Sequence, residues 1–461
     1  MKIAVLNGSP KGPVSVTMQY VRFLQKKSPQ HEFKILDVCQ DIKKLEADEG
    51  AFGAAIETIQ DADAILWATP VYVFVVPGPY KRFIELVSER QAQATFKGKY
   101  AAILTTSVRF FDHTAHAYLH GISEDFGMRV MGAYSAEMYD LLKQGEQKRL
   151  VLFWNFCVKA AEEKIPIQRR FDSLRDGSFR YSPSPSQAKI QTGGRKIVIV
   201  TDAQEGSNLH AMVAKVREYF ANPVEVVNLN AIKMLGGCMG CIQCGFDNVC
   251  FYRDADDVFG VYQKLMAADI VIEAATIKDR FLSARWKTFC DRGFFNSHIP
   301  ILVGKQIGYL VSGPLRQLPQ VRDILEASAQ LHQGNLAGVV TDECSDSREL
   351  DGLLERFAGC LIECHKSGYI HAPTFLGKAG HKILRDEIWA GLRFLFHRDH
   401  EYYTRHGLYD FPRRSLKKRL NESFVRLMLK FPRFRKEFRT KIRSEMVKPL
   451  EKVVEELSTG S

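Results

Sequence analysis

Four cysteines lie close together in the sequence, at Cys238, Cys241, Cys244 and Cys250. Their spacing, C-x2-C-x2-C-x5-C, allows thiolates on a single loop to turn toward one metal centre. Structural zinc sites usually combine two separate C-x-x-C pairs, whereas iron–sulfur clusters favour a C-x2-C-x2-C run with a fourth cysteine nearby or elsewhere. The spacing therefore predicts a four-iron cluster, with zinc, a disulfide pair and a lapsed site as the alternatives.

The remaining cysteines do not suggest a disulfide framework, because six of the ten are scattered singly along the 461 residues. We therefore expect a reducing compartment, the cytoplasm, which would also preserve an iron–sulfur cluster. No export signal is evident at the N-terminus, and no uncharged apolar run is long enough to span a bilayer. A chain of this length that is 46% hydrophobic can bury two or three domain cores.

The elements that must position these cysteines form an internal repeat. Each copy begins with a short apolar strand and a loop of small residues, and continues with helices and three further strands. Short buried strands that alternate with helices predict parallel sheets covered on both faces. The fold class predicted is α/β, with two doubly wound parallel sheets in tandem. The strands expected first, second and fourth are residues 2–7, 33–38 and 100–105 in one copy and 195–200, 224–228 and 306–311 in the other.

We expect the two α/β domains at residues 1–171 and 195–370. A segment rich in Ser, Pro, Arg and Gly, residues 172–194, is predicted to be the linker. Residues 371–461 show helical periodicity without strands and carry 21 Lys and Arg against 11 Asp and Glu, a net charge of +10. Residues 1–370 hold 43 basic and 42 acidic residues, so the basic character of the chain belongs to its C-terminal extension.

The loop after the first strand can bind a phosphate. Doubly wound sheets bind ligands beyond the carboxyl ends of their strands, and this loop offers hydroxyls and backbone N–H groups where a helix begins. It matches neither the P-loop nor the dinucleotide fingerprint, which favours a monophosphate. The alternative is a turn that only caps a helix. The predicted phosphate-loop residues are Ser9, Lys11, Ser15, Val16 and Thr17.

Two further loops follow the third and fourth strands of the first copy. Backbone amides after a proline-containing bend can bond the polar edge of a flavin, and a tyrosine can pack against its ring. No residue pattern typical of a nucleophile and its base is present, so no catalytic residue is assigned. The residues predicted to complete the pocket are Pro70, Val71, Tyr72, Val73, Thr106 and Ser107.

These motifs resemble a known family. The segments Gly8-Ser9-Pro10-Lys11, Ser15-Val16-Thr17 and Pro70-Val71-Tyr72 are similar to those of flavodoxin-like NAD(P)H-dependent FMN reductases. The cysteine run, placed after the second strand of the second copy, resembles that of iron–sulfur flavoproteins of the same superfamily. The resemblance covers about residues 1–370. It implies flavodoxin-like domains, FMN, NADH or NADPH as co-substrate, and a 4Fe-4S cluster.

The second copy departs from the family pattern. Asp202 and Glu205 would repel a phosphate, Leu209 stands where the pattern has Thr, and the loop after the third strand lacks Pro-x-Tyr. In the first copy, Val16 replaces the usual Asn. The simplest hypothesis is FMN in the first domain and the cluster in the second. FMN in both domains, or in the second alone, are the alternatives.

We therefore expect a flavin-dependent NAD(P)H oxidoreductase that passes electrons between FMN and a four-iron cluster to a small-molecule or protein acceptor. The alternatives are an electron carrier without its own substrate and a zinc-stapled, non-catalytic scaffold. The extension at 371–461 suits an anionic membrane surface or an acidic redox partner, or packs on the second domain. Nucleic acid is the least favoured partner, since no nucleic-acid-binding motif is present. We also expect a homo-oligomer.

Overall fold

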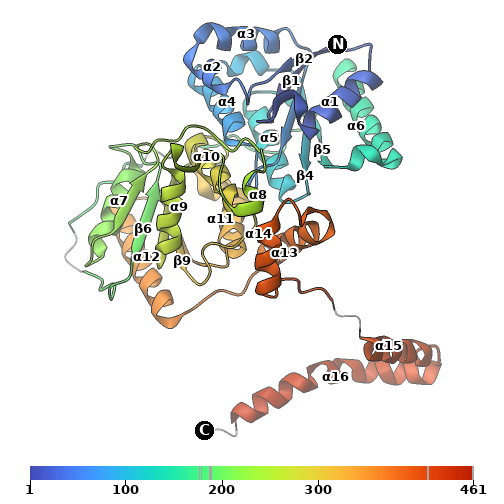
Figure 1. Ribbon diagram of the computed structural model, residues 1–461, viewed down its shortest axis with the longest axis vertical. Helices are drawn as coiled ribbons and strands as arrows, with labels where there is room; N and C mark the ends of the chain where they lie inside the picture. The colour runs from blue at the N-terminus through green and yellow to red at the C-terminus, as the bar shows by residue number, and fades with distance from the viewer. Residues whose placement is uncertain (176, 178, 186–188, 413–414, 459–461) are drawn as a thin grey trace. The chain divides into compact units, whose positions relative to one another are not determined.

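The computed structural model describes residues 1–175, 177, 179–185, 189–412 and 415–458. The chain divides into two compact units, Met1–His406 and Gly407–Ser461. The first unit contains two α/β domains, and the second consists of helices (Figure 1). The predicted linker residues 176, 178 and 186–188 lie outside the described residues, as do positions 413–414 and 459–461 of the extension.

The first domain is built on a five-stranded parallel sheet with the order β2-β1-β3-β4-β5. Its strands are β1 (Lys2–Asn7), β2 (Glu32–Leu36), β3 (Ala64–Pro70), β4 (Tyr100–Ser107) and β5 (Arg129–Glu137). One face packs on α1 (Val16–Lys27) and α6 (Gln144–Glu162). The other packs on α3 (Glu49–Gln60), α4 (Gly78–Glu89) and α5 (Asp112–Asp125), while a short α2 (Ile42–Ala47) follows β2. Because both faces are covered, the central strands β1, β3 and β4 are almost entirely buried.

The second domain repeats this topology with the order β7-β6-β8-β9-β10. Its strands are β6 (Ile197–Thr201), β7 (Glu225–Asn228), β8 (Ile270–Thr276), β9 (Gln306–Ser312) and β10 (Asn335–Thr341). One face packs on α7 (Asn208–Tyr219) and α12 (Ser347–Ser367), the other on α9 (Val258–Ala267), α10 (Ala284–Arg292) and α11 (Pro319–Leu331). The prediction of two doubly wound parallel sheets in tandem is confirmed.

The two domains meet through α4 and α10, which occupy equivalent places in the repeat. The backbone N–H of Gly78, at the start of α4, donates to a carboxylate oxygen of Asp291 on α10 over 2.7 Å. In the same way, the N–H of Ala284 at the start of α10 donates to Glu85 on α4 over 2.7 Å. Each helix N-terminus is thus capped by a carboxylate of the other domain, an arrangement that also suits the helix dipoles.

Two buried lysines extend this interface across the domains. Lys81 on α4 pairs with Asp279 of the second domain at 2.9 Å, and Lys287 on α10 donates to the backbone oxygen of Tyr72 at 2.8 Å. Both lysines are at most 1% exposed. A buried charge without its partners is costly, so these contacts hold the two domains in one mutual arrangement.

The predicted linker packs on the second domain. Tyr181 is buried, its backbone N–H donates to the side chain of Asn208, and its hydroxyl bonds Asp351 on α12. Beyond α12, the first unit continues with α13 (Phe375–Glu387), a π-helical turn (Ile388–Leu392) and α14 (His397–Arg405). The second unit contains α15 (Leu416–Met428) and α16 (Pro432–Ser458). Within the described ranges, none of the helices combines the length and apolar character needed to cross a membrane.

Candidate functional site

The loop between β1 and α1 is held by its own hydroxyl groups. Ser9 is buried, and its Oγ accepts from the backbone N–H of Lys11 at 3.3 Å. Ser15 is the N-cap of α1, where its Oγ accepts from the N–H of Met18 at 3.2 Å. An N-cap of this kind fixes the direction in which the helix starts. The loop therefore presents the N-terminus of a twelve-residue helix at the carboxyl edge of the sheet.

The first and third predicted loops are joined by a hydrogen bond. Thr17 Oγ1 and Thr106 Oγ1 lie 2.6 Å apart, and both side chains are buried. Val16 is the first residue of α1, so its N–H and that of Thr17 have no acceptor within the helix. Ser107 turns toward its own loop, where its Oγ accepts from the N–H of Arg109 at 2.8 Å. The structure thus brings Val16, Thr17 and Thr106 together at one edge.

The last residue of β3, Pro70, and the loop that follows it, residues 71–73, lie beside these groups. The N–H of Val71 donates to the backbone oxygen of Thr106 at 3.0 Å, which ties the second predicted loop to the third. Val73 has a φ of 35°, a value that marks a tight bend for a residue with a side chain. Burial, and after it the nearby Cys238, raises the pKa of Tyr72 well above its ordinary value. Tyr72 therefore faces the cysteine segment.

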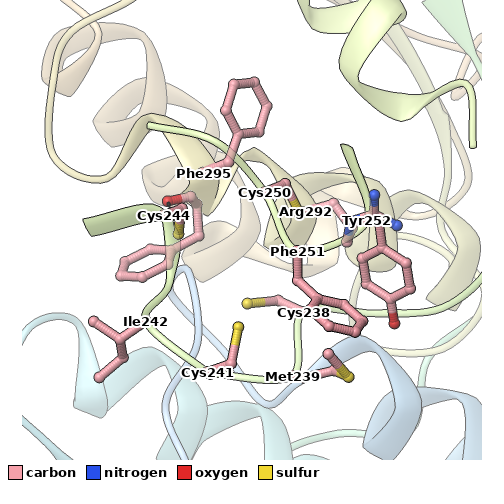
Figure 2. Close-up of a pocket in the computed structure, with 11 residues that line it drawn as sticks. Cys238, Met239, Cys241, Ile242, Cys244, Cys250, Phe251, Tyr252, Arg292 and Phe295 are labelled. Carbon is pink, nitrogen blue, oxygen red and sulfur yellow. Dashed lines mark hydrogen bonds between the residues drawn. The ribbon is translucent and has the colours of Figure 1, made fainter. Parts of the chain in front are cut away.

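The four cysteines lie between β7 and α9 of the second domain and line a single cavity (Figure 2). The sulfur atoms of Cys238 and Cys241 point toward the same space in that view. Burial raises the pKa of Cys238 and of Cys244 to about 12 each. The rest of the lining is largely apolar or aromatic: Met239, Ile242, Phe251, Tyr252, Phe294, Phe295 and the buried Arg292.

Among the residues that the structure describes, no three His, Cys, Asp or Glu side chains are grouped so that they could hold one metal ion. The four cysteines share a cavity, but a metal site on them is not confirmed and stays a prediction. A single zinc ion would draw its thiolates to about 2.3 Å from one point. The four irons of a cluster instead bind one thiolate each, so its ligands surround a larger volume.

Arg292 contributes an unused hydrogen-bond donor to the cavity. Its two terminal nitrogens donate to Asp256 at 2.7 and 2.9 Å, and its guanidinium lies 3.9 Å from the centre of the Tyr252 ring. Burial by itself would lower the pKa of Arg292, but hydrogen bonding to Asp256 and the proximity of Cys250 raise it above its ordinary value. Its Nε is buried without a hydrogen-bond partner among the described residues. Such a donor suits an anionic group, because an unpaired buried N–H is costly.

The cysteine segment of the second domain packs against the predicted flavin loops of the first. Gly240 has a φ of 63°, and a Cβ built on it would lie 1.9 Å from Tyr72 Oη and 2.9 Å from Lys11 Cε. A Cβ on Gly237 would likewise lie 2.9 Å from Pro79 at the start of α4. A side chain at Gly240 would therefore displace Tyr72 and Lys11 and would also be strained at this φ. Residues far apart in the sequence are thus in contact.

Comparison with known families bears on the first of these domains. The family profile of NADPH-dependent FMN reductases matches residues 1–139, which include all three predicted flavin loops. The matched residues lie within the first domain, which is named the FMN-reductase domain after this match. The match supports the oxidoreductase activity that the loop motifs predict.

Solved structures similar to the chain include several flavoenzymes. An NADH:FMN oxidoreductase in its apo form is 18% identical over 34% of this chain and 89% of its own, with a TM-score of 0.30. FerB, an NAD(P)H:(acceptor) oxidoreductase from Paracoccus denitrificans, is 24% identical over 34% and 97%, with a TM-score of 0.29. An FMN-dependent NADH-azoreductase from Bacillus anthracis is 11% identical over 36% and 99%, with a TM-score of 0.26. None of the curated proteins matches the chain.

The carboxyl edge of the second sheet differs from the edge of the first sheet that carries the predicted flavin loops. Asp202 stands in the place of Gly8, and its carboxylate accepts from Thr276 N–H at 2.9 Å and bonds the Ser283 hydroxyl. Burial raises the pKa of Asp202 to about 6. The side chain of Asn208 accepts a hydrogen bond from the N–H of Tyr181 and donates one to the backbone oxygen of Phe179, both in the linker. A cavity of about 430 Å³ lies at this edge, with Asp202 in its wall.

Two residues that contact the predicted site or line its cavity have no local signal in the sequence. Gly240 lies within the cysteine run, but its contact with Tyr72 depends on how the two domains pack. Arg292 follows Cys250 by a whole strand and helix and reaches the cavity from the end of α10. Only the repeat itself, which aligns α10 with α4, could have drawn attention to that helix.

Proposed function

We propose that this protein oxidises NADH or NADPH through FMN in its FMN-reductase domain and passes the electrons to a 4Fe-4S cluster held by Cys238, Cys241, Cys244 and Cys250. The observation that carries the proposal is the contact of Gly240 with Tyr72 and Lys11. It joins the cavity lined by the four cysteines to the loops of the flavin site within one chain. Bound FMN would accept two electrons as a hydride and release them one at a time. The cluster would take up single electrons.

The first domain offers the groups that a flavin phosphate needs. The free N–H groups at the start of α1 and the side chain of Lys11 would hold the phosphate, with Ser9 and Ser15 shaping the loop around it. Residues 70–73 would bond the edge of the ring, and Tyr72 would pack against it. The joined hydroxyls of Thr17 and Thr106 keep these loops at a constant separation.

The second domain offers the groups that an anionic cluster needs. Its cavity is largely apolar, which excludes water, and four thiolates would surround the cluster. The unused Nε–H of Arg292 points to a hydrogen bond with a sulfur atom, since it has no other partner. Hydrogen bonds of this kind and burial are the usual means by which a protein adjusts the potential of a cluster.

The same contacts support one FMN per chain. A phosphate at the corresponding edge of the second domain would meet the buried carboxylate of Asp202. The second copy shares Asn208 with the family pattern, but the side chain of this residue already makes its hydrogen bonds to the linker backbone. We infer that this edge no longer serves a flavin and that the second domain has kept the cluster function.

The test is the composition of protein purified without oxygen. We expect one FMN and about four iron and four sulfide per chain, with a broad absorbance beside the flavin bands that bleaches on reduction. Cys241→Ser should lose iron and sulfide and keep FMN. Cys344→Ser, a matched change of a cysteine outside the cavity, should keep all three. One zinc without sulfide would overturn the cluster, and loss of FMN from folded Cys241→Ser would overturn the division between the domains.

A further inference from the structure

The second unit of the chain is strongly basic. Residues 407–461 contain fifteen Lys and Arg and seven Asp and Glu, a net charge of +8, whereas residues 1–406 have a net charge of +3. The unit thus holds most of the net positive charge of the protein, +8 of +11, in about an eighth of its length. Such a field attracts anionic surfaces over about a Debye length.

Helix α15 carries an exposed apolar stripe. Leu416, Leu420, Phe424 and Leu427 are between 54% and 76% exposed. At about 100° per residue these four positions fall within an arc of about 80°, so they form one face of the helix. Phe431, in the turn that follows, is 56% exposed. A continuous stripe of large apolar side chains facing water is unusual for a folded surface.

Helix α16 carries a second stripe of the same kind. Met446, Leu450 and Val453 are 71%, 65% and 56% exposed and lie within an arc of about 60°. Exposed basic residues precede this stripe along the same helix: Arg433, Arg435, Lys436, Arg439, Lys441 and Arg443. Helix α15 carries the exposed basic residues Arg419 and Arg426. Each of the two helices thus combines exposed apolar side chains with positive charge.

The unit also contains apolar residues that are already half-buried. They are Val425, Met428 and Leu429 on α15 and its end, and Phe434, Phe438 and Ile442 on α16. The Arg435 side chain donates to the backbone oxygen of Leu429 at 2.8 Å, which fixes the turn between the helices. The two exposed stripes are therefore distinct from the residues that the unit uses for its own packing.

We infer that α15 and α16 bind the surface of an anionic membrane, with their exposed apolar stripes in the headgroup region. Amphipathic helices with Leu, Phe and Val on one face and Lys and Arg around it bind in this way. Charge complementarity favours anionic lipid over a second copy of the chain, because two units of +8 repel each other. An acidic protein partner would use the charge but would not require two separate apolar stripes.

The test uses the full chain and vesicles of phosphatidylcholine with or without 30% phosphatidylserine. We expect at least tenfold tighter binding to the anionic vesicles, weakened by salt. Leu420→Glu with Phe424→Glu should weaken that binding at least tenfold more than Asn421→Glu with Thr440→Glu. Both double variants change the charge equally, but only the first enters a stripe. Circular dichroism and NADPH oxidation should be unchanged in both.

Three outcomes would overturn the inference. Equal binding to neutral and anionic vesicles would show that charge plays no part. Equal losses in the two double variants would show that the stripes do not enter the membrane. A concentration-dependent dimer that only the stripe variant abolishes, without vesicle binding by the unaltered chain, would assign the stripes to a second copy.

Discussion

Replacement of Gly240 by alanine tests whether the cysteine segment forms a wall of the flavin site. A Cβ at Gly240 would lie 1.9 Å from Tyr72 Oη, whereas ordinary contact begins at 3.4 Å, so the two must separate by about 1.5 Å. Lys11 Cε, at 2.9 Å from the same Cβ, must also give way. The substitution therefore displaces two of the residues that we assign to FMN, Tyr72 and Lys11.

Gly240→Ala should lower both the affinity for FMN and the folding stability. A hydrogen bond between Lys11 and a phosphate is worth about 1.5–3 kcal/mol, so its loss weakens FMN binding about tenfold to 150-fold. The backbone contributes separately, because a residue with a side chain at a left-handed φ costs about 1–2 kcal/mol of folding stability. Only the first of these effects should appear in the affinity for FMN.

Gly206→Ala is the matched control. Gly206 has a φ of 76°, but a Cβ built on it meets no described atom within 4 Å. Both variants should therefore lose about 1–2 kcal/mol of stability in urea unfolding, whereas only Gly240→Ala should bind FMN more weakly when its fluorescence quenching is titrated. Equal FMN dissociation constants for the two variants would refute the contact between the cysteine segment and the flavin site.

Three other predictions concern single contacts. Asp202→Asn should stabilise the protein by up to about 3 kcal/mol at pH 8 and give almost no gain at pH 3, because a carboxylate whose pKa is raised from 3.8 to about 6 costs stability as the pH rises through that range. A difference in urea unfolding that stays constant with pH would contradict this. Asp291→Ala should lower the free energy of unfolding by about 3–5 kcal/mol, because it removes the carboxylate that pairs with the buried Lys287. A decrease below about 1 kcal/mol in urea unfolding would contradict the buried pair. Thr17→Val should weaken FMN binding by about 1 kcal/mol, because it removes the hydrogen bond to Thr106. An unchanged dissociation constant for FMN would contradict this prediction.

The sequence was sufficient to predict features that depend on local patterns. Apolar runs such as residues 2–7 and 306–311 became buried strands because both faces of each sheet are covered. Loops that follow such strands must meet at one edge of a parallel sheet, which is why Thr17 and Thr106 lie together although they are far apart in the chain. The match of residues 1–139 to FMN reductases includes the same loops.

The rest depends on packing between distant segments. The contact of Gly240 with Tyr72 exists because α4 and α10 dock through reciprocal caps, and no local signal in either helix specifies that partner. The unused Nε of Arg292 is equally invisible in the sequence, since an arginine at a helix end is ordinarily solvated. The segment around Tyr181 has the composition of a linker, yet it packs on α7 and α12.

Rapid mixing with NADPH under anaerobic conditions shows whether FMN and a cluster exchange electrons within one chain. We expect the flavin absorbance to fall first and the cluster absorbance then to bleach at a rate independent of protein concentration. Protein stripped of FMN should keep its cluster and show no bleaching until FMN is restored. Electron transfer within one chain would be ruled out if the rate of cluster bleaching rose in proportion to protein concentration, or if bleaching proceeded without FMN.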